Sequence, residues 1–402
     1  MTVLEMIYAA GFSAYLHGFG AIDSWLDGRE TENSVHIFTN ADVADLARLF
    51  ENLRYPGPYL ADAAIDENEK TRTWYFRCAD SFNDNRSSFS LLEFYRDCKT
   101  HAFYDPRGIY PLLAGIRRSI RRPGTAANPP EIFMEGINFN FDRCRSLMDA
   151  ALILAKYFPQ DSGAEQYIEK MAGLFSGRLH EGSPPGQEEQ RILLCALMTS
   201  ANPGLGLELL KASGFISEFW PELAILEQAD HSKEFHPEGN AWKHTMETFR
   251  HRKMAFNNRK TCPYDLRLSL GLLLHDTGKP IAISAGNHRF YGHAELGETQ
   301  ARRFLERLGF SASITHDICF LVKNHMLPAA LPRLPLFRTG EIMSSPLFPL
   351  LLELYRCDES SSFKGLDGYY ESSAAYQSFL KNRRNPYRSA DGKKLNNRQM
   401  SL

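Results

Sequence analysis

The most informative stretch of the chain is Leu272-Leu273-Leu274-His275-Asp276-Thr277-Gly278-Lys279-Pro280. The leucines are typical of a buried helix, and Gly278 and Pro280 end it. Imidazole and carboxylate groups are ligands for divalent cations. Adjacent helical residues point about 100° apart, so both side chains can reach one ion only near the helix end. Because an unpaired buried carboxylate is costly, the pair predicts a metal site rather than simple helix packing.

Histidine is concentrated around this pair. Nine of the 13 histidines lie between residues 231 and 325. A second pair, His316-Asp317, lacks the Gly-Lys-Pro stop, and we interpret it as structural. The predicted metal ligands are His244, His275, Asp276, His293, His325 and Asp358. These six exceed the four ligands of a structural zinc site, so open coordination positions or two ions are expected.

The ligand types also indicate which ion to expect. Imidazole-rich ligation favours Mn, Fe, Co or Ni, with Mg or Zn also allowed, as one or two ions. Such an ion lowers the pKa of bound water and neutralises charge on phosphoryl oxygens. Lys279 is placed to contact a phosphate oxygen, and a solvated turn lysine is the alternative. The predicted catalytic residues are therefore His275, Asp276 and Lys279.

Composition sets outer limits. A chain of 402 residues predicts two to three domains. The hydrophobic share of 43% and charged share of 23% exclude a disordered chain, and a net charge of −2 excludes a global basic field. No apolar run approaches the roughly 20 residues that span a bilayer. No signal peptide is expected, and the scattered seven cysteines favour a reduced, cytoplasmic protein.

Periodicity divides the chain in two. Strands are expected over 34–39, 71–78 and 87–95, with an amphipathic helix over 41–53 capped by Asn40. From about residue 131 the pattern is helical, with a helix starting at Asn202-Pro203. Residues 381–398 hold seven basic side chains and one acidic, so they predict a solvated tail or an RNA contact.

Three segments carry a family resemblance. Residues 236–245 (HPEGNAWKHT) match the pattern HPEGDxWxHT, residues 273–280 match LLHDIGKP with Thr277 for Ile, and residues 290–297 match FxGHxxLG. The region resembles the HD superfamily of metal-dependent phosphohydrolases. More narrowly, it is similar to the HD domain of bacterial CCA-adding tRNA nucleotidyltransferases and poly(A) polymerases.

The N-terminal part resembles the nucleotidyltransferase head of the same family. Residues 15–23 align with YLVGGxVRD, where Phe19 and Ile22 replace Gly and Arg. Residues 34–39 align with DIDIxT, and residues 96–102 with RDFTxNA. Asp142 and Arg145 resemble remnants of the neck motif EDPLRxLR. The resemblance implies a degenerate nucleotide site at Gly18, Asp23, Ser34, His36, Arg96 and Asp97.

This head departs from the family at its metal ligands. Ser34 and His36 stand where two carboxylates should hold the ions of nucleotidyl transfer. A Phe at position 19 would also obstruct the approach of backbone amides to a triphosphate. We therefore expect an inactive head. The alternative is rescue by nearby acids, namely Asp23, Asp27, Glu30 and Glu32.

The fold expected from the resemblance is α+β and mostly α. It comprises a small α/β nucleotidyltransferase-like head (1–115), an all-helical neck and body (116–230), an all-helical HD domain (231–365) and a basic tail (366–402). Contacts to tRNA or other RNA are expected through the tail and a basic neck cluster, unless both are merely solvated. That cluster consists of Arg117, Arg118, Arg121 and Arg122.

Three functions follow from these observations. The leading hypothesis is an HD phosphohydrolase that cleaves phosphoesters of nucleotides or RNA ends, in a chain whose nucleotidyl-transfer site is inactivated. The second is an active CCA-adding or poly(A)-adding nucleotidyltransferase. The third is a non-catalytic RNA-binding protein. No membrane partner is expected.

Overall fold

The structure is a computed structural model of the 402-residue chain. It describes residues 1–27, 34–56, 61–67, 72–79, 91–109, 143–158, 164–177, 183–229, 239–253, 264–285, 290–362 and 365–385, with Leu113 and residues 179–180. The chain forms two compact units. Unit 1 is Met1–Phe215 with 255–263, and unit 2 is Ile216–Met254 with 264–402. The four-part division expected from the sequence stays a prediction.

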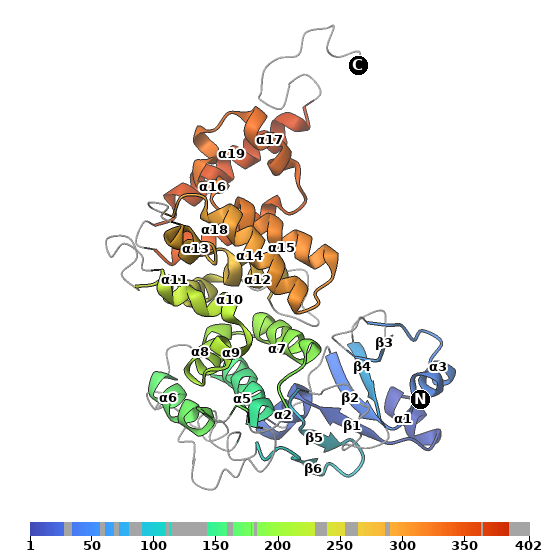
Figure 1. Ribbon diagram of the computed structural model, residues 1–402. Helices are drawn as coiled ribbons and strands as arrows, with labels where there is room; N and C mark the ends of the chain where they lie inside the picture. The colour runs from blue at the N-terminus through green and yellow to red at the C-terminus, as the bar shows by residue number, and fades with distance from the viewer. Residues whose placement is uncertain are drawn as a thin grey trace. The chain divides into compact units, whose positions relative to one another are not determined.

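Unit 1 begins with a six-stranded mixed sheet in the order β3-β4-β2-β1-β5-β6, coloured from blue to teal in Figure 1. Strands β2 and β4 are parallel, and the other pairs are antiparallel. The elements are α1 (Val3–Ala9), β1 (Ala14–His17), α2 (Phe19–Asp27), β2 (Ser34–Thr39), α3 (Val43–Leu49), β3 (Ala63–Glu67), β4 (Arg72–Cys78), β5 (Tyr95–Asp97) and β6 (Phe103–Tyr104).

The predicted α/β head is confirmed, with corrections to single elements. Helix α3 is capped by Asp42, whose side chain accepts from the Asp45 N–H. Asn40, the expected cap, instead accepts two hydrogen bonds from Ser13. Of the strand expected over 87–95, only Tyr95 is in a strand, and 87–90 lie outside the described residues.

The remaining secondary structure among the described residues of unit 1 is helical. Its helices are α5 (Arg143–Tyr157), α6 (Ala164–Phe175), α7 (Gln187–Thr199) and α8 (Pro203–Ala212), and α9 (Phe215–Phe219) begins at its last residue. The predicted start of α8 is confirmed, with Pro203 in its first turn. Its packing is close, because a Cβ on Gly206 would lie 2.6 Å from the Ala151 carbonyl of α5.

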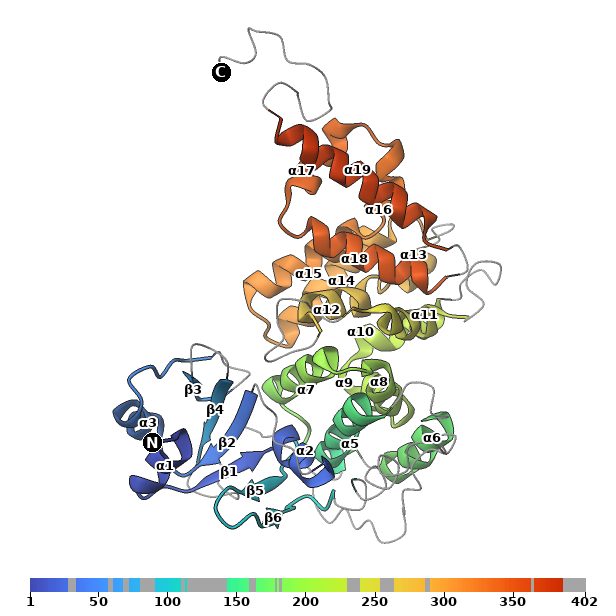
Figure 2. The ribbon, with the colours of Figure 1, turned by 180° about the vertical axis from the view of Figure 1, so that it is seen from behind.

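The regular elements among the described residues of unit 2 are all helices, drawn from yellow-green to red in Figure 2. Its elements are α10 (Pro221–Ala224), η1 (Ile225–Gln228), α11 (Ala241–Thr248), η2 (Phe249–His251), α12 (Leu266–Leu274), α13 (Lys279–Ser284), α14 (His293–Arg307), α15 (Ala312–Asn324), α16 (Leu327–Ala330), η4 (Leu331–Arg333), α17 (Leu336–Ser344), α18 (Phe348–Ser360) and α19 (Asp367–Arg383). None of the described helices is both long and apolar enough to cross a bilayer.

Helix α12 is the centre of unit 2. Asp265 caps it by accepting the N–H groups of Arg267 and Leu268, and every residue from Leu268 to Leu274 is buried. It packs against α11, α15 and α18. The helix ends at Leu274, directly before the His-Asp pair. The sequence predicts only a helix stop at Gly278 and Pro280, whereas a new helix, α13, starts there, with Gly278 as its N-cap and Pro280 in its first turn. Burial of α12 therefore presents the pair at the junction of several helices.

Candidate metal centre

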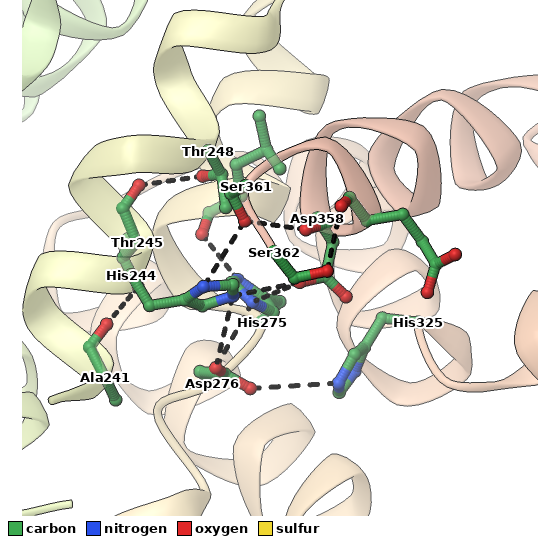
Figure 3. A network of polar contacts seen from close by, with 12 residues as sticks. Ala241, His244, Thr245, Thr248, His275, Asp276, His325, Asp358, Ser361 and Ser362 are labelled. Carbon is green, nitrogen blue, oxygen red and sulfur yellow. Dashed lines mark hydrogen bonds and ion pairs between the residues drawn. The ribbon is translucent and has the colours of Figure 1, made fainter. Parts of the chain in front are cut away.

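All six predicted metal ligands are close together in unit 2. His244 lies on α11, and His275 and Asp276 lie in the turn after α12. His293 begins α14, His325 follows α15, and Asp358 lies in the last turns of α18. Figure 3 shows the side chains of His244, His275, Asp276, His325 and Asp358 gathered around one point. Five elements that are distant in sequence thus contribute to one cluster.

The ligands form two triads. In the first, formed by His244, His275 and Asp358, the ligand atoms lie within 4.8 Å of one another. His244 Nε2 is 2.9 Å and His275 Nε2 is 4.0 Å from Asp358 Oδ1. The second triad is formed by Asp276, His293 and His325, with His293 Nε2 and His325 Nε2 3.0 Å apart.

Asp276, a member of the second triad, also lies close to two members of the first. Its Oδ2 is 3.3 Å from His275 Nε2 and 4.0 Å from His244 Nε2. Its Oδ1 is 3.9 Å from His293 Nε2 and 4.0 Å from His325 Nε2. Because each carboxylate oxygen faces a different triad, Asp276 can bridge two ions or complete either set.

Local hydrogen bonds orient three of the four imidazoles. The Nδ1 atoms of His275, His293 and His325 bond the carbonyl three residues earlier, at 2.7, 2.9 and 2.7 Å. Because Nδ1 donates the proton, Nε2 keeps its lone pair. Gly292, at φ +75°, provides the turn that places His293 at the start of α14.

The site fits a cation. The lone pairs of His293 Nε2 and His325 Nε2 face each other at 3.0 Å, an arrangement that repels unless a positive charge lies between them. His275 Nε2 is buried and makes no hydrogen bond to the described residues. Buried polar atoms without such a partner are costly, and a metal ion would satisfy both features.

The charges match what metal ligation needs. Burial alone would raise the pKa of Asp276, but the interactions of its carboxylate with His275 and Lys279 hold that pKa well below its usual range. Burial also raises the pKa of Asp358, and the hydrogen bond from His244 outweighs this and lowers it. Burial lowers the pKa of His325 to about 3. At neutral pH the acids are therefore ionised and His325 is neutral.

Lys279 and a strained backbone complete the surroundings. Lys279 Nζ lies 2.7 Å from Asp276 Oδ2 and 5.5 Å from the centre of the Phe290 ring. Phe290 has a φ of +60°, a conformation that side chains rarely adopt, and its carbonyl accepts the His293 Nδ1 proton. A metal ion held here would supply activated water and a Lewis acid for a phosphoester.

The sequence missed one polar contact in this centre. Ser361 Oγ lies 3.3 Å from His244 Nδ1, just after the end of α18. Serine after a helix is common, so its type carried no signal. The structural interpretation of the other pair agrees with the geometry, since His316 is exposed and Asp317 pairs with Arg267 at 3.4 Å.

The head residues predicted as a nucleotide site lie around β1, α2, β2 and β5. Gly18 adopts a φ of +61° between β1 and α2. Asp23 accepts hydrogen bonds from Lys156 (2.9 Å) and Tyr157 (2.6 Å) of α5. Arg96 contacts His101, and Asp97 accepts the Lys99 and Thr100 N–H groups, so it closes the turn after β5.

On β2, His36 lies against an aromatic ring, with two cationic side chains near enough to affect its pKa. Its ring stacks on Tyr75 of β4 with centroids 4.8 Å apart, and burial lowers its pKa to about 4, with Arg77 and Lys156 adding to the shift. Position 34 lies in register with Thr73, which in turn is opposite Asp66. Asp66 is therefore a carboxylate on the same face of the sheet as position 34, but it already accepts hydrogen bonds from Arg54 and Thr73.

The described head residues thus do not supply a free pair of carboxylates for two metal ions. Of the acids considered for rescue, Glu30 and Glu32 lie outside the described residues. So do the neck arginines 117–122, Asp142 and most of the basic tail. Arg145 is described and forms an ion pair with Glu189 at 2.6 Å.

Comparison with known proteins identifies part of the chain directly. Residues 242–347 match the family model for the HD domain. This segment contains five of the six predicted ligands, and Asp358 lies beyond its end.

Two curated proteins are similar in sequence. The CC-adding tRNA nucleotidyltransferase of Thermus thermophilus is 28% identical over 235 residues, which cover 58% of this chain and 51% of that protein. The Multifunctional CCA protein of Halorhodospira halophila is 33% identical over 102 residues, covering 25% and 23%. The chain therefore spans about half the length, or less, of the curated relatives it matches.

Solved structures of CCA-adding enzymes are also similar. The Bacillus stearothermophilus enzyme in complex with CTP has a TM-score of 0.46 at 15% identity, over 94% of this chain and 81% of that one. The Thermotoga maritima enzyme complexed with tRNA has a TM-score of 0.41 at 13% identity, over 99% and 84%.

These findings correct the leading functional hypothesis. A phosphohydrolase with an inactivated transfer site is the wrong description, because both curated relatives carry the names of CCA-type tRNA enzymes and one is named a nucleotidyltransferase. That hypothesis relied on the absence of carboxylates at positions 34 and 36 and gave less weight to the similarity along the rest of the chain. The family resemblance itself is confirmed: the chain carries an HD domain at residues 242–347 and is related in sequence to the CCA-adding tRNA nucleotidyltransferases.

Proposed function

We propose that the chain adds nucleotides to the 3′ end of tRNA, as a nucleotidyltransferase of the CCA-adding kind. The observation that carries this proposal is the 28% identity over 235 residues with a CC-adding tRNA nucleotidyltransferase. Its substrates would be a tRNA 3′ hydroxyl and a nucleoside triphosphate such as CTP or ATP.

The head offers support for phosphate binding. Arg77 and Lys156 lie near enough to His36 to lower its pKa further, after the larger effect of burial. Arg96 lies opposite Leu16 on β1, the strand that leads to Gly18. We assign no step through metal ions in this head, because the described residues lack a free carboxylate pair.

The first prediction concerns nucleotide transfer. Purified full-length protein is incubated with tRNA lacking its 3′ CCA and with labelled CTP or ATP, in the presence of Mg or Mn. We expect label at the tRNA 3′ end. Arg96→Ala should reduce incorporation about 10- to 100-fold if its guanidinium binds the triphosphate, since charged hydrogen bonds contribute about 1.5–3 kcal/mol.

Arg48→Ala is the matched control, because Arg48 is an exposed arginine of α3 whose ion pair with Asp45 lies within the same helix. It should leave incorporation unchanged. If stoichiometric amounts of the wild-type protein add no label from either nucleotide, the proposed function is wrong.

We further propose that the six ligands of unit 2 hold one or two divalent ions. The division into two triads around Asp276 supports two positions. Their imidazole content favours Mn, Fe, Co or Ni. Lys279, beside Asp276 and only slightly exposed, would contact an anionic oxygen of a phosphoester. Hydrolysis of phosphoesters at this centre would be a second reaction, beside nucleotide addition.

The second prediction concerns metal ligation. Titration with Co²⁺, followed by calorimetry, should show binding to the wild-type protein. His275→Ala and Asp276→Asn each remove a buried ligand and should abolish binding or weaken it at least 10-fold. His316→Ala changes an exposed histidine outside the cluster and should bind as the wild type does. Equal affinities in all four proteins would contradict the ligand assignment.

A further inference from the structure

His244 differs from the other three histidines in the hydrogen-bond partner of its Nδ1, the ring nitrogen that faces away from the cluster. His275, His293 and His325 all use the carbonyl three residues earlier in their own segment. For His244 that carbonyl belongs to Ala241, and it accepts the Thr245 hydroxyl at 2.8 Å. His244 lies inside α11, so its own helix offers its Nδ1 no comparable carbonyl.

A serine from another helix takes this place. Ser361 Oγ lies 3.3 Å from His244 Nδ1 and donates its own hydrogen to the Asp358 carbonyl at 2.6 Å. Because that hydrogen is committed to the carbonyl, the Ser361 oxygen faces His244 as an acceptor. Figure 3 shows Ser361 on the side of the His244 ring away from Asp276.

This contact matters when an ion binds. An imidazole that coordinates a metal through Nε2 keeps its proton on Nδ1, and this donor is buried here because His244 is only 1% exposed. Outer partners of this kind orient ligating histidines and raise their basicity. Without an acceptor, the buried N–H would lose its hydrogen bond on metal binding.

We propose that Ser361 is a positioning residue of the metal centre, which accepts the His244 Nδ1 proton and aims His244 Nε2 at the ion. Ser361 also lies three residues after the ligand Asp358, and its hydroxyl bonds the Asp358 backbone. One side chain therefore connects two ligands of the first triad. The inference rests on the proposed metal ligation by His244 and does not depend on nucleotidyl transfer.

The test measures metal affinity and a spectroscopic signal. Calorimetry with Co²⁺ compares wild type, Ser361→Ala and Ser361→Thr. We expect Ser361→Ala to raise the dissociation constant about 10- to 100-fold, as loss of an outer partner does. Ser361→Thr keeps a hydroxyl and should restore affinity. In the Zn²⁺-loaded protein, the slowly exchanging Nδ1–H proton resonance of His244 should be visible in wild type and lost in Ser361→Ala.

Ser362→Ala is the matched control, because the neighbouring Ser362 hydroxyl donates to the carbonyl of Glu359, a residue outside the six-ligand set, at 2.9 Å. It should bind metal as the wild type does. If Ser361→Ala does not fold, Ser361→Cys carries the test, since a thiol is a weak acceptor of similar size and should also weaken binding.

Two results would overturn the inference. One is unchanged affinity together with a retained His244 Nδ1–H signal in Ser361→Ala or Ser361→Cys. The other is absence of metal binding by the wild type, which removes the ligation on which the inference depends. Nucleotide incorporation measured on the same preparation shows separately whether the proposed function fails.

Discussion

At position 278 the chain has no room for a side chain. A Cβ on Gly278 would lie 1.9 Å from the His293 carbonyl oxygen and 2.5 Å from the Gly297 nitrogen. The sequence predicts Gly278 only as a helix stop, which is a local property. The contact with α14 brings the turn that carries Asp276 against the helix that carries His293.

A substitution at this glycine should therefore affect both stability and metal binding. Gly278→Ala is expected to lower the free energy of unfolding by about 3 kcal/mol, since overpacking forces backbone shifts. It should also weaken Co²⁺ binding, because His293 must move. Gly173→Ala is the control: a Cβ there meets nothing within 4 Å, and alanine in a helix is favourable. Chemical denaturation measures the free energy of unfolding of both variants. Equal values for Gly278→Ala and Gly173→Ala would contradict the close contact at Gly278.

The members of the cluster could be predicted from sequence because imidazole and carboxylate groups have distinctive chemistry. The His275-Asp276 pair, three further histidines and Asp358 are the six residues that the structure brings together, and metal binding by them stays a prediction. The division into two triads was not predictable, because it depends on how five elements pack. Ser361 was not predictable either, since its role arises only from its position beside His244.

At the scale of elements, α5 is joined to the head by a buried ion pair. Asp149 of α5 accepts the Leu92 N–H at 2.7 Å and the Arg107 guanidinium at 3.0 Å. Burial raises the pKa of Asp149 to about 6, more than the charge of Arg107 lowers it. The sequence marked Asp142 and Arg145 on this segment but not Asp149, whose partners are 42 and 57 residues away.

The raised pKa predicts a pH dependence with a definite sign. The folded-state pKa of about 6 exceeds the ordinary value of 3.8, so the folded state binds more protons between these values. The contribution of Asp149 is fully present below about pH 4 and is lost as the pH rises through 6. Urea denaturation at pH 4.5 and 7 should show this fall in wild type and a smaller one in Asp149→Asn.

The control variant is Asp317→Asn, which changes a half-buried aspartate of α15. Its free energy of unfolding should fall between pH 4.5 and 7 by as much as that of the wild type. A fall of the same size in Asp149→Asn would exclude Asp149 as its source.

The elements show where sequence patterns suffice. Strand β2 and the start of α8 follow from β-branched residues and from Asn-Pro, both local signals. Strand β3 (Ala63–Glu67) was missed, because its sequence AAIDE lacks a strand pattern and pairing with β4 stabilises it. The cap of α3 is Asp42 rather than Asn40, because Asn40, directly after β2, accepts hydrogen bonds from Ser13, directly before β1.

At the scale of the whole molecule, the chain forms two compact units, and the candidate ligands all lie in unit 2. We therefore expect bound metal to stabilise unit 2 against unfolding. A ligand that binds only the folded state stabilises it by about 2.7 kcal/mol at 100 times its dissociation constant. In differential scanning calorimetry of the full chain, Co²⁺ should raise the midpoint temperature of the transition in which unit 2 unfolds. The rest of the unfolding profile should stay in place.

His275→Ala supplies the control for this experiment. Its scan with Co²⁺ should superimpose on its scan with a chelator. A shift of the entire profile in wild type would indicate that the two units unfold together, and no shift would contradict metal binding to unit 2.

The position of Asp276 has a consequence for how the centre would fill. One carboxylate gives an oxygen to each triad, so the first ion to arrive changes the charge and orientation that the second one meets. By thermodynamic reciprocity, each ion then alters the affinity of the other by the same factor. Occupancy would therefore be cooperative in one direction or the other, and a single-site binding curve would not describe it.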